Sequence, residues 1–93
     1  MKYEKIATEI GKLVDIKDAA YGSSFLKSEK ILKILYPDGI EPSQYRDMLA
    51  ITRIIDKLFR IATDKDALGE NPFKDIAGYG ILGVANGKTQ EKE

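Results

Sequence analysis

The apolar residues of this chain recur at helical intervals along most of its length. Between residues 3 and 19, Ile6, Ile10 and Leu13 mark one face, and charged side chains lie between them. Only residues 79–84, a short apolar run with glycines, admit a strand as the alternative. The pattern therefore predicts an all-α protein. Its four expected helices cover residues 3–19, 24–36, 42–63 and 72–85.

Residues that form turns and helix caps separate these segments. Gly22 is expected to end the first helix, and a serine after it to cap the second. The sequence from Tyr36 to Gly39 predicts a turn, because proline sets one corner and glycine accepts a positive φ. Pro42 is a favoured first-turn residue of the third helix. Asn71 followed by Pro72 is a strong start signal for the fourth.

A chain of 93 residues has room for one domain with one core. We expect residues 1–86 to form a single four-helix bundle-like domain and residues 87–93 to be a solvated C-terminal tail. The expected third helix is apolar around most of its circumference, more so than a small monomer easily buries. Ala77 and Gly80 also lie on a small-residue face of the fourth helix. These features predict a homo-oligomer.

Composition removes several classes of function. The 15 basic and 15 acidic side chains give no net charge, which argues against extended nucleic-acid binding or binding to an anionic membrane. Without cysteine or histidine, the chain itself forms no disulfide, zinc-finger site or Ser-His-Asp triad. Any metal would need oxygen ligands only. No signal peptide or membrane-spanning run is found, so we expect a cytoplasmic protein.

A stripe of charged residues on the expected third helix is the main candidate for chemistry. It contains Arg53, Lys57 and Arg60, with Asp56 between them. A solvated face is the ordinary interpretation of such a stripe. Here the helix has little circumference left for solvent, and an antiparallel fourth helix would bring Asp75 close. Half-buried charges need partners, and a phosphate-bearing ligand would be one because arginine binds phosphate bidentately.

Two other functions compete with ligand binding. The acidic residues of the second half suit a magnesium-dependent, pyrophosphohydrolase-like enzyme, but the Glu-Glu-x-x-Glu helix of such enzymes is absent. The acidic residues in question are Asp56, Asp64, Asp66, Glu70 and Asp75. The third possibility is an adaptor that binds a protein partner. The segment Gly83–Thr89 looks like a phosphate-binding loop but lacks its first glycine and the helix that should follow, so we set it aside.

Four short motifs, in this order, resemble the nucleotide modification associated domain family of small helical bacteriophage and prophage proteins. They are Tyr21-Gly-Ser-Ser-Phe25, Ile34-Leu-Tyr-Pro-Asp-Gly-Ile40, Arg53-Ile-Ile-Asp-Lys-Leu-Phe-Arg60 and Asp75-Ile-Ala-Gly-Tyr79. The resemblance spans residues 18–84 and implies a phage-type protein linked to nucleotides. Together with the stripe, it gives a candidate ligand-binding set and no catalytic or metal-binding residue. That set is Tyr21, Ser23, Ser24, Arg53, Asp56, Lys57, Arg60, Asp75 and Tyr79.

We assign these residues roles by their chemistry. Arginine and lysine would meet phosphates, a tyrosine would stack on a base, and the serines would donate hydrogen bonds. The expected function is binding of a phosphate-containing nucleotide without a cofactor. Sequestration of a cyclic or otherwise modified nucleotide signal of bacterial anti-phage defence is a role suggested by analogy. Magnesium enters only if the protein is an enzyme.

Overall fold

The computed structural model describes residues 2–92, with side chains up to residue 87. It contains four α-helices and two short 3-10 turns, and the described residues include no strand. The elements are α1 (Lys2–Ala20), α2 (Ser24–Leu35), η1 (Pro42–Gln44), α3 (Tyr45–Asp64), η2 (Ala67–Gly69) and α4 (Pro72–Lys92). The all-α prediction is confirmed, and residues 79–84 are helical.

Local sequence explains where α3 and α4 begin. Asn71 Oδ1 accepts the backbone N–H of Lys74 at 3.2 Å and so caps α4. The expected third helix starts as a 3-10 turn, where the Glu41 N–H donates to Gln44 Oε1 at 2.8 Å. The turn before it closes as expected, with Gly39 at a φ of 86°. Both helix starts were therefore predictable from short motifs.

The connection between α1 and α2 is tighter than expected and uses its serine differently. Gly22 and Ser23 both adopt positive φ angles, 61° and 60°. Ser23 precedes α2 but makes no capping hydrogen bond, and its Oγ donates instead to Asp18 Oδ2 at 3.3 Å. The predicted serine cap is wrong at this position because the left-handed backbone turns the hydroxyl back toward α1. A Cβ on Gly22 would lie 2.4 Å from Thr63 Oγ1, so this turn lies directly against the end of α3.

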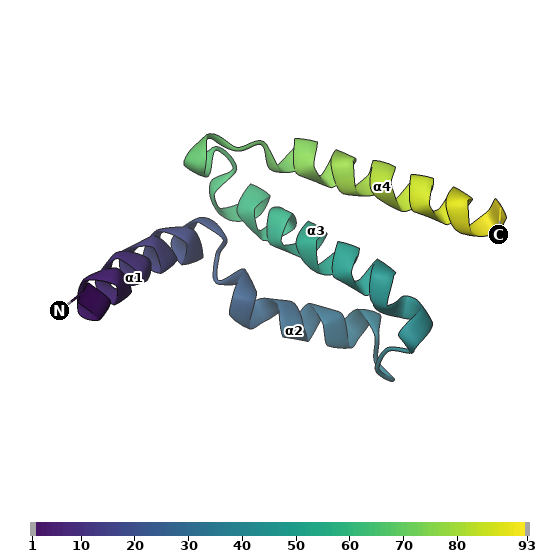
Figure 1. The fold of residues 1–93 in the computed structure, drawn as a ribbon, viewed down its shortest axis with the longest axis horizontal. Coiled ribbons are helices and arrows are strands. Elements are labelled where there is room, and N and C mark those ends of the chain that lie inside the picture. The colour runs from purple at the N-terminus through teal and green to yellow at the C-terminus, as the bar shows by residue number, and fades with distance from the viewer. Residues whose placement is uncertain (1, 93) are drawn as a thin grey trace.

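The helix α3 lies between α2 and α4 and makes most of the contacts between elements (Figure 1). The fourth helix runs back along α3, and α2 lies on the other side. In contrast, α1 meets α3 only near its C-terminal end and leads away from the other helices. The arrangement is a three-helix layer centred on α3 with α1 projecting from one end.

Few apolar side chains are buried within the single chain. Among the described side chains, Ala20, Ile55 and Pro72 are the buried apolar ones, and Leu58 on α3 is 53% exposed. Part of the apolar surface of α3 is therefore exposed in the single chain. The radius of gyration is 16.5 Å, against ~12 Å for a compact domain of this length. The projecting α1 contributes to the elongated shape (Figure 1).

The fourth helix continues past the expected domain end. We predicted a tail from residue 87, but the backbone of α4 is helical to Lys92. Residue 93 lies outside the described residues. None of the described helices combines the length and the apolar character that crossing a bilayer requires.

Candidate functional site

The charged stripe of α3 meets the predicted polar residues of α4. Lys57 Nζ lies 3.3 Å from Asp75 Oδ2, and Arg53 lies over the ring of Tyr79 at 5.9 Å from its centroid. Lys57 also lies 5.7 Å from the centroid of the Tyr21 ring, in the turn after α1. The structure therefore brings together five residues of the predicted set.

The antiparallel register of α3 and α4 explains these pairs. Arg53 and Lys57 are one helical turn apart on α3, and Asp75 and Tyr79 are one turn apart on α4. When two helices run in opposite directions, the later residue of one pair meets the earlier residue of the other. The matched partners are therefore Lys57 with Asp75 and Arg53 with Tyr79, as the distances show.

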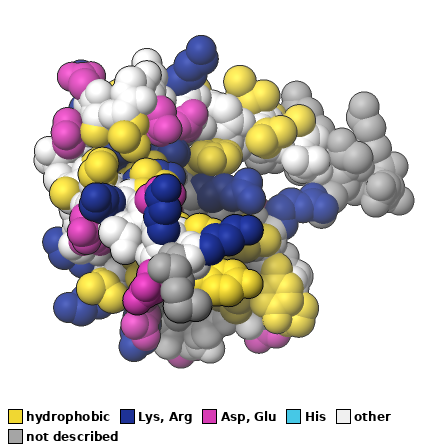
Figure 2. All heavy atoms as spheres, turned by 60° about the vertical axis from the view of Figure 1, so that its left-hand side comes forward, with side chains coloured by type: hydrophobic (Ala, Val, Ile, Leu, Met, Phe, Trp, Pro, Cys, Tyr) yellow, Lys and Arg dark blue, Asp and Glu magenta, His cyan; other side chains and the backbone are white. Residues whose placement is uncertain are grey.

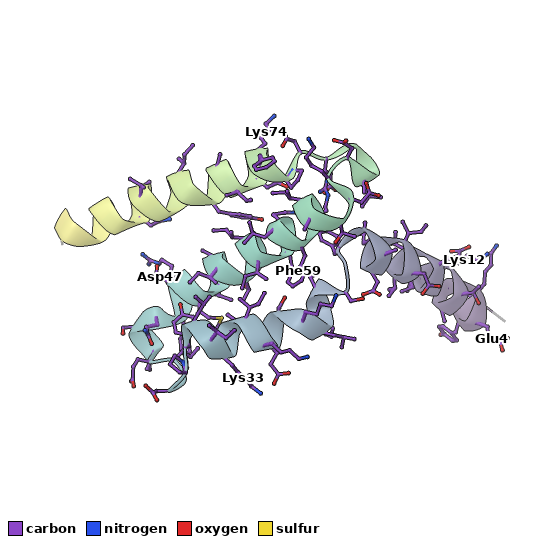
Figure 3. The ribbon with its side chains drawn as sticks, turned by 180° about the vertical axis from the view of Figure 1, so that it is seen from behind. Glu4, Lys12, Lys33, Asp47, Phe59 and Lys74 are labelled. Carbon is purple, nitrogen blue, oxygen red and sulfur yellow. The ribbon has the colours of Figure 1, made fainter. Side chains whose placement is uncertain are left out.

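A pocket of about 260 Å³ lies between α3 and α4 next to Arg53. Its α3 wall carries Arg46 and Asp47 as well as Arg53, and Tyr79 and Asn86 contribute from α4. The lining consists of Arg46, Asp47, Leu49, Ala50, Arg53, Tyr79, Leu82, Gly83, Asn86 and Gly87. Figure 2 shows lysine and arginine side chains gathered in the hollow beneath α4. In Figure 3, Asp47 lies near the start of α3 on the side of α4.

Small residues on α4 leave room for this pocket. A Cβ built on Gly83 would meet no other atom within 4 Å, so its position faces open space. Arginines, a tyrosine ring and aliphatic side chains therefore share one hollow. Such a mixture of a few polar groups with apolar surface is typical of small-molecule sites.

The environment of Lys57 changes the pKa of its ammonium group. Burial lowers the pKa of the Lys57 ammonium, since its side chain is only 15% exposed. The negative charge of ionised Tyr21, the hydrogen bond to Asp75 and the charges of Asp75 and Glu70 raise the pKa by more. The net pKa lies above the ordinary lysine value. Lys57 is therefore charged at neutral pH, and its charge is largely balanced by Asp75.

Arg60 has a different environment from the one expected. Its side chain is fully buried, and Nη1 donates to Glu70 Oε2 at 2.6 Å. Nη2 donates to the carbonyl oxygens of Lys65, Ala67 and Glu70 at 3.1, 2.9 and 2.6 Å. We predicted that Arg60 meets a ligand phosphate, but protein acceptors occupy its two terminal nitrogens, Nη1 and Nη2. Arg60 holds the connection between α3 and α4, and we leave it out of the proposed site.

The remaining predicted residues lie outside the α3–α4 pocket. Ser24 is buried at 5% exposure, and Ser23 is bonded to Asp18. Tyr21 and Ser24 line a second hollow of about 270 Å³ at the junction of α1 and α2. Asp56 is half-buried on α3 and is not part of either lining. The predicted set thus does not form one site: Arg53 and Tyr79 line the α3–α4 pocket, and Tyr21 and Ser24 line the hollow at α1 and α2.

Sequence reasoning missed Arg46, Asp47 and Asn86, which line the α3–α4 pocket. Arg46 lies two helical turns before Arg53, so the same periodicity extended toward the start of the helix would have found it. Asn86 was missed because we ended the fourth helix near that residue. Arg46 and Asp47 were thus missed inside the expected helix 42–63, and only Asn86 was missed because of a helix boundary.

The acidic residues considered for magnesium do not form a cluster. Glu70 is paired with Arg60, and Asp75 with Lys57. Among the residues whose side chains the structure describes, no group of three or more potential metal ligands comes together.

Comparisons of the chain with protein-family models, with curated proteins and with solved structures found no match.

Proposed function

We propose that the protein binds a phosphate-bearing nucleotide in the α3–α4 pocket and releases it unchanged. The observation that carries this proposal is that Arg46, Arg53 and Tyr79 line one hollow. Arginine binds phosphate through a planar fork of donors, and tyrosine offers a flat apolar face. These are the two kinds of surface that a nucleotide needs, one for its phosphate and one for its base.

The spacing of the two arginines favours an extended anion. Arg53 lies seven positions after Arg46 on the helix, a rise of about 10.5 Å along the axis. Two side chains this far apart can contact different parts of one extended ligand more readily than they can both contact a single phosphate group. A ligand with two phosphates, linear or cyclic, fits this arrangement.

Tyr79 and Arg53 together provide the stacking surface. The guanidinium lies over the ring, and both a guanidinium plane and an aromatic ring are surfaces on which a base stacks. Next to them, Lys57 and Asp75 form a half-buried ion pair that keeps α3 and α4 in register. Because each charge of this pair is balanced by the other, we expect the pair to hold the two helices in place rather than to bind the ligand.

Sequestration of a nucleotide signal in a phage-infected bacterial cell is the biological role we propose for this binding. The resemblance of residues 18–84 to a phage family linked to nucleotides supports it. Binding without turnover is sufficient for such a role, since a bound signal no longer reaches its receptor.

Calorimetry against a panel of linear and cyclic nucleotides, with and without magnesium, tests the proposal. Binding should be independent of magnesium, and heat-released ligand should have an unchanged mass. A shortened product that depends on magnesium would indicate an enzyme. Failure of every nucleotide to bind would refute the proposal.

Substitution of Arg53 locates the site. Arg53→Ala should weaken binding by about 1.5–3 kcal/mol, or roughly ten- to a hundredfold, because one charged hydrogen-bonding contact is lost. Arg53→Lys should recover only part of this loss, since the ammonium keeps the charge without the fork. Lys30→Ala, on the exposed surface of α2, is the matched control and should bind normally. If Tyr21→Ala abolishes binding and Arg53→Ala does not, the ligand occupies the α1–α2 hollow instead.

A further inference from the structure

The outer face of α4 is an apolar stripe that no other described element covers. Phe73, Ile81 and Val84 are 57%, 69% and 62% exposed. Ala77 and Gly80 lie between them and help to form a shallow apolar groove of about 590 Å³. This groove lies on the opposite side of α4 from the nucleotide pocket, because its residues fall on the other helical face. A continuous exposed stripe of this kind on a small protein marks a contact surface.

The helix α1 also has an apolar face that no other described element covers. Ile6, Ile10, Leu13 and Val14 lie on one face and are 43–56% exposed. Only the C-terminal end of α1 contacts α3, and Figure 1 shows the rest of α1 leading away from the other helices. An isolated helix is marginal in water, and helices in proteins gain most of their stability from packing an apolar face. The apolar face of α1 therefore needs a partner that its own chain does not supply.

The exposed area of the chain indicates how large that partner surface is. The accessible surface is 7456 Å², whereas a compact monomer of this mass exposes ~5,400 Å². Each chain thus has about 2,000 Å² in excess, and two chains together would bury about 4,000 Å². That total falls within the range of obligate homodimers, ~2,000–5,000 Å².

Charge and shape favour a second copy of this chain over a membrane. The charges of α1 balance, so an anionic bilayer would not attract it. They are Lys2, Lys5, Lys12 and Lys17 against Glu4, Glu9, Asp15 and Asp18. The large side chains of α1 form a ridge, and the small residues of α4 form a groove. The two helices also have similar lengths, 19 and 21 residues.

We propose that α1 of one copy packs on the outer face of α4 of a second copy, and that the exchange is reciprocal. A twofold arrangement makes each contact twice and leaves neither face uncovered. This inference does not depend on the nucleotide proposal, because the groove and the nucleotide pocket lie on different faces of α4. Either can fail without the other.

Single cysteines test the contact directly, since the natural chain has none. Ile10→Cys marks the apolar face of α1, and Ile81→Cys marks the outer face of α4. The two variants are unfolded together, refolded and treated with a short bismaleimide. A covalent species of twice the 10.4 kDa chain mass that contains one copy of each variant is the expected product. Because each chain carries one cysteine, such a product can only form between two chains.

Lys12→Cys, on the polar face of α1, is the matched control and should give at least tenfold less product with Ile81→Cys. Light scattering of the natural chain should give a mass of at least twice 10.4 kDa. A monomer at micromolar concentration overturns the proposal, whether or not it binds neutral or anionic vesicles. Linkage of Ile10→Cys to itself without linkage to Ile81→Cys also overturns it, because α1 would then pair with α1.

Discussion

Arg60 shows how one residue determines the geometry of a connection. The turn it holds includes Leu68 at a φ of 62°, a conformation that non-glycine residues rarely adopt. Four hydrogen bonds from one guanidinium keep this turn against the end of α3. The start of α4, and with it the position of Asp75 and Tyr79, depends on that contact.

Arg60→Ala should therefore lower the free energy of unfolding by roughly 2–4 kcal/mol, because it removes four hydrogen bonds from a fully buried guanidinium, one of them to a carboxylate. Arg60→Lys should lose less, since the charge remains but fewer acceptors are reached. Urea denaturation at one protein concentration measures both changes. A loss below about 0.5 kcal/mol for Arg60→Ala would mean that the connection is held by something else.

Because of Lys57, we expect the stability of the protein to decrease at alkaline pH. Its pKa is raised in the folded state, so the ion pair with Asp75 contributes fully below the unfolded pKa, about 10.4. That contribution is lost as the pH rises through the higher folded value. We expect the stability of the natural protein to fall above about pH 10.4 by more than that of Lys57→Met.

The matched control for Lys57 is Lys33, whose ion pair with Glu29 is 74% and 73% exposed. Lys33→Met should be within ~0.5 kcal/mol of the natural protein at neutral pH. Thermal unfolding followed at several pH values separates the two variants. If the stability of the natural protein and that of Lys57→Met fall equally as the pH rises above about 10, the proposed role of the Lys57–Asp75 ion pair is contradicted.

At the scale of elements, the sequence predicted helices and their contents better than their arrangement. The apolar period located all four helices, and the expected antiparallel fourth helix correctly placed Asp75 near the charged stripe of α3. The burial of Arg60 was not predictable, because it depends on carbonyl groups in a turn whose backbone angles no residue pattern specifies. The predicted serine cap of α2 was wrong for the same reason, because Ser23 has a positive φ and makes no capping hydrogen bond.

Gly22 is the residue on which the junction of α1, α2 and α3 depends. Its positive φ disfavours any side chain, and a Cβ would be too close to Thr63 Oγ1. We expect Gly22→Ala to destabilise the protein by more than ~1 kcal/mol. Gly11→Ala should stabilise it by up to about 1 kcal/mol, because Gly11 is helical and a Cβ there meets nothing. Equal effects of the two substitutions in urea denaturation would show that the junction is not constrained.

At the scale of the whole molecule, the single chain buries little apolar surface. Its buried apolar side chains are few, and apolar faces of α1 and α4 remain open. A helical protein of this size needs more buried area than α3 alone provides. Sequence patterns give the width of an apolar face but not the chain that covers it.

A concentration-dependent melting temperature should follow, because association stabilises the folded chain by mass action. We expect the midpoint to rise over a roughly hundredfold increase in protein concentration. Gly80→Leu, which fills the groove of α4, should lower the midpoint and reduce the dependence, whereas Gly11→Ala should leave the dependence intact. A midpoint that is constant with concentration would indicate a self-sufficient monomer.

The position of α3 between two neighbours also has a consequence for evolution and protein engineering. Because α2 and α4 pack on α3 without substantial contact with each other, each can change with little effect on the other. Leu82, Gly83 and Asn86 are part of the α4 side of the α3–α4 pocket. A library restricted to these three positions could therefore alter which ligand is selected while α2 and its contacts with α3 stay as they are.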